Sequence, residues 1–191
     1  MSIPLADRGI TPDAWVAALV GMSELIEVVD GELVIKRVGG NPHHYIARRL
    51  AQEFERQWPD VVATAPGNWA LTTSSDGKVV LGRVPDVLVD GAGLLAAEVF
   101  IGVPEAAVEV WSPGNTLAEM NTKRAEYRTA GLPVLCEAFL TEAQEVHLEW
   151  LVNDDGRRWS SIAVAVGEQQ LSVTSPRPFS VAPNALLRRT S

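Results

Sequence analysis

Apolar residues recur along parts of this chain at the spacing of a helix. Between residues 41 and 57, Ile46, Leu50 and Phe54 are four positions apart, and Pro59 follows. This spacing places them on one face of an α-helix, and a proline just beyond the pattern ends it. The sequence therefore predicts an amphipathic helix that packs one face against a core.

Two further helices are indicated by their first residues. Thr116 and Glu119 form a capping box, so a helix is predicted from there to about Ala130, where Gly131 follows. A shorter helix is predicted to begin at Thr11-Pro12-Asp13, because threonine caps a helix and proline suits its first position.

Short apolar runs between turn residues predict strands. Asp30-Gly31 is a common hairpin turn pair, and it predicts a hairpin over residues 26–38. Further strands are predicted at 61–65, 68–73, 78–89, 106–111, 134–140, 145–152, 157–166 and 169–173, before a proline-containing tail. Helices flanking a mixed β-sheet indicate an α/β or α+β fold, and residues 1–191 are predicted to form one domain.

Composition and charge narrow the function classes. The 191 residues are 47% hydrophobic, which is not a disordered composition. The net charge of −8 argues against a broad, non-specific nucleic-acid binder, which needs a basic face. It leaves room for a nuclease with a small local basic patch, because a metal partly neutralises clustered acids.

Cysteine content and the apolar runs bear on location. Cys136 is the only cysteine, so no intrachain disulfide forms. No apolar run approaches 18 residues, and we expect a soluble, cytoplasmic protein with no membrane partner.

Two acids stand out because of their apolar neighbours. Asp86 follows Pro85 at the head of an apolar run, and Glu109 lies inside the apolar strand 106–111. An aspartate after proline also marks ordinary turns and strand edges. If the two acids converge, they repel each other and attract a divalent cation.

Lys123 and two histidines carry open alternatives. Lys123 shares a helical face with Met120 and Tyr127, so either it pairs with the acids or its ammonium extends to solvent. His43 and His44 either contact phosphate and transfer protons or are partly exposed structural residues.

Taken in order, these pieces resemble a known family. The pieces are Pro85-Asp86, the run Glu109-Val110-Trp111-Ser112-Pro113, Lys123 with Tyr127, and Gly131-Leu132-Pro133. The segment Glu24 to Leu33 is similar to that family's entry hairpin, and His43 with Ile46 and Leu50 to its next helix. Over about residues 11 to 175 the chain resembles the Uma-type restriction endonucleases of the PD-(D/E)XK nuclease superfamily.

The resemblance implies a fold, an activity and a site. The fold is a restriction-endonuclease-like core, with a mixed sheet flanked by helices. The implied activity is metal-dependent hydrolysis of phosphodiester bonds in DNA, with Mg²⁺, or Mn²⁺ as substitute, bound by Asp86 and Glu109. Lys123 is expected to position water or the scissile phosphate, replacing the superfamily's strand lysine, since position 111 is Trp. Glu27 is expected to assist at a second metal position.

Departures from the family pattern keep alternatives open. After Pro133 the chain lacks the family's Tyr-Trp pair and aspartate-ended strand. A catalytically inactive binding protein on the same scaffold is the main alternative, and a metal-independent glycosidase with two carboxylates is another. A homodimer is predicted, because two DNA strands suit a two-fold enzyme and the C-terminal strands offer edges.

Overall fold

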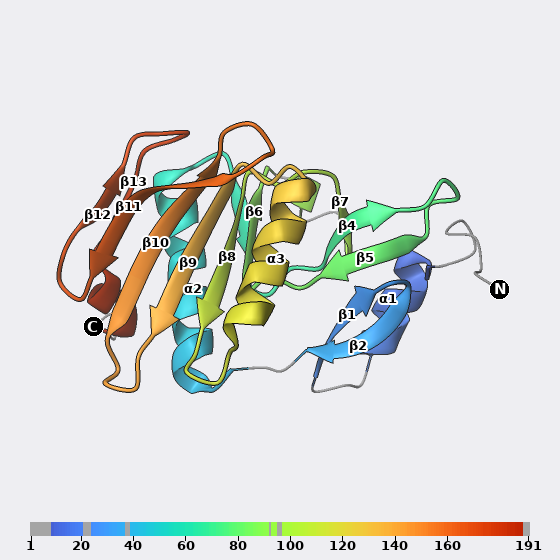
Figure 1. Cartoon of the computed structure of the whole chain (residues 1–191), viewed down its shortest axis with the longest axis horizontal. Helices are drawn as coiled ribbons and strands as arrows, with labels where there is room; N and C mark the ends of the chain where they lie inside the picture. The colour runs from blue at the N-terminus through green and yellow to red at the C-terminus, as the bar shows by residue number, and fades with distance from the viewer. Residues whose placement is uncertain (1–8, 21–23, 37–38, 92, 95–96, 189–191) are drawn as a thin grey trace.

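Two β-sheets of five and six strands and three α-helices form most of the described part of the chain. The computed structural model describes residues 9–20, 24–36, 39–91, 93–94 and 97–188. The larger sheet has the strand order β11-β10-β9-β8-β6-β3 (Figure 1). Its strands are β3 (Val62–Thr64), β6 (Val87–Asp90), β8 (Ala106–Trp111), β9 (Val134–Leu140), β10 (Val146–Asn153) and β11 (Trp159–Val166). Only β8 and β9 run parallel in it, so the sheet is mixed.

Helices cover both faces of the larger sheet. Helix α2 (Asn41–Gln57) packs on one face and α3 (Leu117–Thr129) on the other (Figure 1). Strand residues alternate between these two layers. Along β8, Val108 joins the α2 layer, whereas Ala107 joins the layer that contains Tyr127 of α3. By the same alternation, Glu109 faces α3.

The smaller sheet has the strand order β2-β1-β5-β4-β7. Its strands are β1 (Leu25–Val29), β2 (Glu32–Lys36), β4 (Trp69–Thr73), β5 (Val79–Arg83) and β7 (Phe100–Ile101). Helix α1 (Pro12–Leu19) packs against it through Trp15, which is fully buried. The Trp15 indole donates a 2.7 Å hydrogen bond to the carbonyl of Ile26.

The segment between β5 and β6 carries the chain from one sheet to the other. One continuous strand over 78–89 was predicted, and that prediction is wrong: Val84, Pro85 and Asp86 interrupt it. Proline has no N–H for a strand ladder, which explains why pairing stops there. The interruption places Asp86 where the two sheets meet.

Most other predicted elements are present, with small shifts at their ends. The hairpin ends at Lys36, and residues 37–38 of its predicted range lie outside the described residues. A mixed sheet flanked by helices was predicted. The described residues form the larger sheet, the smaller sheet and a separate two-stranded sheet. The predicted tail contains structure that the sequence did not indicate: β13 (Phe179–Val181) pairs with β12 (Leu171–Val173), and a 3-10 helix spans Pro183–Leu187. Among the described residues, no helix has the length and apolar character needed to cross a membrane.

Candidate active site

Three residues singled out in the sequence line one cavity. Asp86 lies between the sheets, Glu109 on β8 and Lys123 on α3. All three line a cavity of about 190 Å³ together with Ser112, Asn115 and Glu119. Glu109 and Lys123 follow Asp86 by 23 and 37 positions in the sequence. The three residues meet because β6, β8 and α3 are neighbours in the fold.

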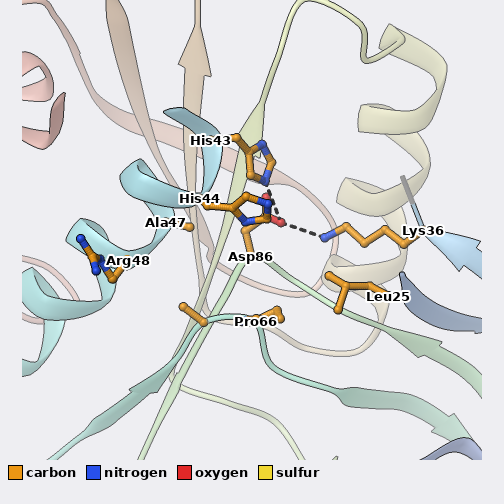
Figure 2. Close-up of a pocket in the computed structure, with 9 residues that line it drawn as sticks. Leu25, Lys36, His43, His44, Ala47, Arg48, Pro66 and Asp86 are labelled. Carbon is orange, nitrogen blue, oxygen red and sulfur yellow. Dashed lines mark hydrogen bonds and ion pairs between the residues drawn. The ribbon is translucent and has the colours of Figure 1, made fainter. Parts of the chain in front are cut away.

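Both carboxylate oxygens of Asp86 accept hydrogen bonds. Oδ2 accepts one from the backbone N–H of Val110 at 2.8 Å. Oδ1 lies 2.8 Å from the ammonium of Lys36 and 3.1 Å from Nε2 of His43. Figure 2 shows Lys36 and His43 approaching Asp86 from β2 and α2. Asp86 is therefore held by three separate elements.

The pKa of Asp86 is lowered despite its burial. Burial alone would raise the pKa of this carboxyl, but the charge of Lys36 and the hydrogen bond with His43 outweigh it. The pKa lies well below the ordinary value of an aspartate, so Asp86 is ionised throughout the neutral range.

Glu109 lies deeper and has different partners. Its side chain is 2% exposed, and both oxygens lie 3.1 Å from the ammonium of Lys123. The hydroxyl of Tyr127 donates a 2.5 Å hydrogen bond to Oε1. Burial raises the pKa of Glu109, and the nearby charge of Asp86 raises it further, although Lys123 opposes both.

Lys123 is buried rather than extended to solvent. Only 4% of the residue is exposed, which excludes the alternative of an ammonium in water. Its Nζ lies 3.1 Å from Glu109 and 3.5 Å from Glu27. Burial lowers the pKa of this ammonium, but the two carboxylates raise it well above the ordinary lysine value. Lys123 is therefore a permanent cation at the base of the cavity.

Glu27 is bound mainly to an arginine. Arg83 lies 2.6 Å from its Oε2 and makes two 2.7 Å hydrogen bonds to Glu126 on α3. Burial raises the pKa of Glu27, but Lys123 and Arg83 bring it below its ordinary value. Glu27 thus touches the site through Lys123, and it is not among the described residues that line the cavity.

The donor set fits a small, hard cation. Among the described residues, no three histidine, cysteine, aspartate or glutamate side chains form a ready metal cluster. Mg²⁺ needs no such cluster, because it commonly uses one or two carboxylates and keeps waters or substrate phosphates as its other ligands. Asp86 and Glu109, buried on one cavity, match that requirement.

Three contacts of the site were not anticipated from the sequence. Lys36 and His43 hold Asp86, and Tyr127 holds Glu109. Lys36 ends a strand whose partner strand carries Glu27, and residues on one face of a hairpin approach the same neighbours. The predicted hairpin pairing was therefore the sequence signal that Lys36 lies near the site. For His43, the signal was its helical spacing from the apolar residues Ile46 and Leu50, which places it on the same face of α2. Both apolar residues are fully buried.

A second cavity of about 210 Å³ adjoins the first. It shares Lys36, His43 and Asp86 with it, and His44 and Arg48 of α2 also line it (Figure 2). His44 and Arg48 are exposed. Lysine, arginine and histidine side chains therefore line part of this cavity, although the chain as a whole is acidic.

Comparison with known proteins identifies the family of this chain. The sequence pattern of the Uma2 family, described as "Putative restriction endonuclease", matches residues 12–183. The chain belongs to the Uma2 family. A search of curated proteins finds no match.

Solved structures show that the fold of this Uma2 member is shared. One match is the crystal structure of a "putative nuclease" of the DUF820 group from Anabaena variabilis ATCC 29413. It has a TM-score of 0.56 and 14% sequence identity, covering 87% of this chain and 90% of that chain. At this identity the likeness establishes the mixed α/β fold and nothing finer.

Proposed function

We propose that this protein is a divalent-metal-dependent endonuclease that hydrolyses phosphodiester bonds in DNA. The observation that carries the proposal is the meeting of buried Asp86, Glu109 and Lys123 on one cavity. Two acids that can hold a divalent metal, with a lysine beside them, suit metal-dependent phosphodiester hydrolysis. Membership of the Uma2 family supports the same reaction class.

Each residue has a distinct role in this proposal. Asp86 and Glu109 would hold Mg²⁺, which when bound would supply Lewis acidity and acidify a coordinated water. Lys123 orients the attacking water and stabilises negative charge that develops on the phosphate oxygens. Glu27 lowers the cost of burying Lys123, and it is the candidate for a second metal position.

In this proposal, DNA approaches the site through the second cavity. Lys36, His44 and Arg48 line the cavity next to Asp86, where phosphates flanking the scissile bond would lie. Lys36 and Arg48 are cations and supply a local positive potential that the overall charge of −8 lacks.

Replacing Asp86 tests the proposal directly. Asp86→Asn should abolish Mn²⁺ binding measured by calorimetry and cleavage of supercoiled plasmid with Mg²⁺ or Mn²⁺. Asp90→Asn is the matched control, because Asp90 ends β6, the strand that follows Asp86, and does not line the cavity. Equal Mn²⁺ binding by wild type and Asp86→Asn would remove Asp86 from the site.

A catalytically inactive binding protein is the second candidate function. The observation that favours it is that all four oxygens of Asp86 and Glu109 already have partners. A metal therefore has to share these oxygens with their present donors or displace Lys36 or Lys123 from one of them. If the wild type binds DNA but neither binds Mn²⁺ nor cleaves DNA, this candidate replaces the nuclease.

A further inference from the structure

Strand β2 forms one edge of the smaller sheet in the described part of the chain. It pairs with β1 on one side, and no strand of the described chain lies on its other side. Three consecutive apolar residues are exposed on it: Leu33 at 46%, Val34 at 44% and Ile35 at 60%. Natural edge strands are usually protected by a charge, a proline or a bulge at their centre. β2 has none of these, since its register with β1 is unbroken.

The backbone of β2 is arranged to accept another strand. Asp30 and Gly31 have φ angles of 52° and 79°, which together form the two-residue turn of a tight hairpin. The pair that closes such a turn, Val29 with Glu32, is hydrogen bonded, and hydrogen-bonded positions then alternate. Leu33 and Ile35 therefore direct their backbone N–H and C=O groups to the open side.

The sequence of β2 complements itself. In Glu32-Leu33-Val34-Ile35-Lys36, antiparallel pairing centred on Val34 places Leu33 opposite Ile35 and Glu32 opposite Lys36. Opposite charges and apolar pairs across strands both stabilise a sheet. Glu32 makes no ion pair within the described chain, so its carboxylate is available to a partner. We propose that a second copy of this chain pairs with β2 in antiparallel register, on a two-fold axis through Val34.

This pairing would bring the partner's Glu32 to the candidate active site. Glu32, Val34 and Lys36 lie on one face of the hairpin, the face of Glu27. Lys36 is the residue that holds Asp86. The partner's Glu32 would lie beside the Lys36 ammonium and compete with Asp86 for it, which frees an Asp86 oxygen for a metal. This coupling rests on the proposed nuclease function, whereas the pairing itself does not.

The edge strand β11 of the larger sheet provides a comparison within the same molecule. β11 has Ile162 at 46% and Val164 at 62% exposed, yet its residues Trp159–Val166 include no charge. Its pairing with β10 is also irregular between Trp150 and Leu151. β11 therefore lacks the charge pattern that would fix the register of a second copy.

A single cysteine at the proposed axis tests the pairing. Val34→Cys should form an intermolecular disulfide in a glutathione redox buffer, seen as a dimer on a non-reducing gel. The two copies of residue 34 would form a non-hydrogen-bonded pair with Cα atoms about 4.5 Å apart, within the range of disulfides. The native Cys136 is fully buried, so it does not interfere. Val164→Cys is the matched control on β11. Cross-linking of Val34→Cys no faster than that of Val164→Cys would overturn the proposal.

Light scattering on unoxidised protein provides the second measurement. The wild type should have the mass of a dimer at high micromolar concentration. Val34→Lys places two ammonium groups on the axis and should weaken association about tenfold or more. Val164→Lys should leave the mass unchanged. A monomeric wild type at every concentration would reject the pairing while leaving the nuclease assay unaffected, and loss of nuclease activity alone would leave the pairing intact.

Discussion

Asp86 and Glu109 line one cavity, yet their surroundings move their pKa values in opposite directions. Asp86 has two cationic or hydrogen-bonding side chains and a backbone N–H, and its pKa is lowered. Glu109 is more deeply buried and has a single lysine with a tyrosine hydroxyl, and its pKa is raised. Burial raises the pKa of both acids; neighbouring charges and hydrogen bonds outweigh it at Asp86 and do not outweigh it at Glu109.

This difference assigns separate work to the two acids. Asp86 is a fixed anion that a cation can approach at any neutral pH. Glu109 and Lys123 form a coupled pair in which a proton or a metal competes for the same carboxylate. Changes to Lys123, to Lys36 and to the two acids separate these roles, and the expected effects decrease in that order.

Replacing Lys123 removes the cation that pairs with Glu109, and it should have the largest effect. Lys123→Met should still bind Mn²⁺, but cleavage of plasmid DNA should fall on the order of a hundredfold or more. The free energy of unfolding should fall by about 3 kcal/mol, because Glu109 and Glu27 lose the cation between them. Activity and urea unfolding measure the two effects.

A double variant serves as the control for Lys123→Met. Lys123→Met combined with Glu109→Gln removes both charges of the pair and should recover much of the lost stability but no activity. A Lys123→Met protein as active as wild type would contradict the catalytic assignment of Lys123 and leave only the two carboxylates.

Replacing Lys36 removes the ammonium that pairs with Asp86, and its effect on the protein should be smaller than that of replacing Lys123. Lys36→Met leaves Asp86 with His43 and the Val110 N–H. Without the competing ammonium, Mn²⁺ should bind about tenfold more tightly by calorimetry, a gain of about 1.4 kcal/mol. Unchanged Mn²⁺ affinity would show that Lys36 does not compete with a metal for Asp86.

The acid dependence of stability should show the smallest effect and the clearest sign. The folded pKa of Asp86 lies below its ordinary value of 3.8, so its contribution is full above that value and is lost as pH falls below it. Asp86→Asn should flatten the acid side of urea unfolding measured between about pH 2 and pH 5.

Glu109→Gln should change the pH dependence in the other direction. The folded pKa of Glu109 lies above its ordinary value of 4.5, so its contribution is full at lower pH and is lost as pH rises through the folded pKa. Glu109→Gln should therefore leave the acid side unflattened and reduce the loss of stability at higher pH. The same effect from both variants would show that the two acids titrate alike.

Elements with strong local signals could be predicted from the sequence, whereas the joint between the sheets could not. Helix α2 ends at Gln57, as its apolar spacing and Pro59 predict, and β9 spans the predicted 134–140. Pro85 gave a signal for an interruption, but which sheet each half joins depends on long-range pairing. The short strand β13 lies close to prolines on both sides and carries too few residues for a pattern.

The site follows the same division. Asp86, Glu109 and Lys123 were identifiable because each carries charge next to apolar residues. Lys36 could not be assigned to Asp86, because their contact joins residues 50 positions apart from different elements. His43 was recognised as a candidate, but only the packing of α2 against the larger sheet places its ring on Asp86.

The hydrogen bond from Val110 to Asp86 gives the protein a built-in spectroscopic reporter. β6 pairs with β8 only as far as Val87 opposite Val108, and beyond that point a side-chain carboxylate accepts the N–H of Val110. The chemical shift of this one amide in a ¹⁵N-labelled sample responds to whatever else Asp86 Oδ2 contacts. It therefore distinguishes occupancy of the carboxylate from turnover, even in a sample that contains no DNA.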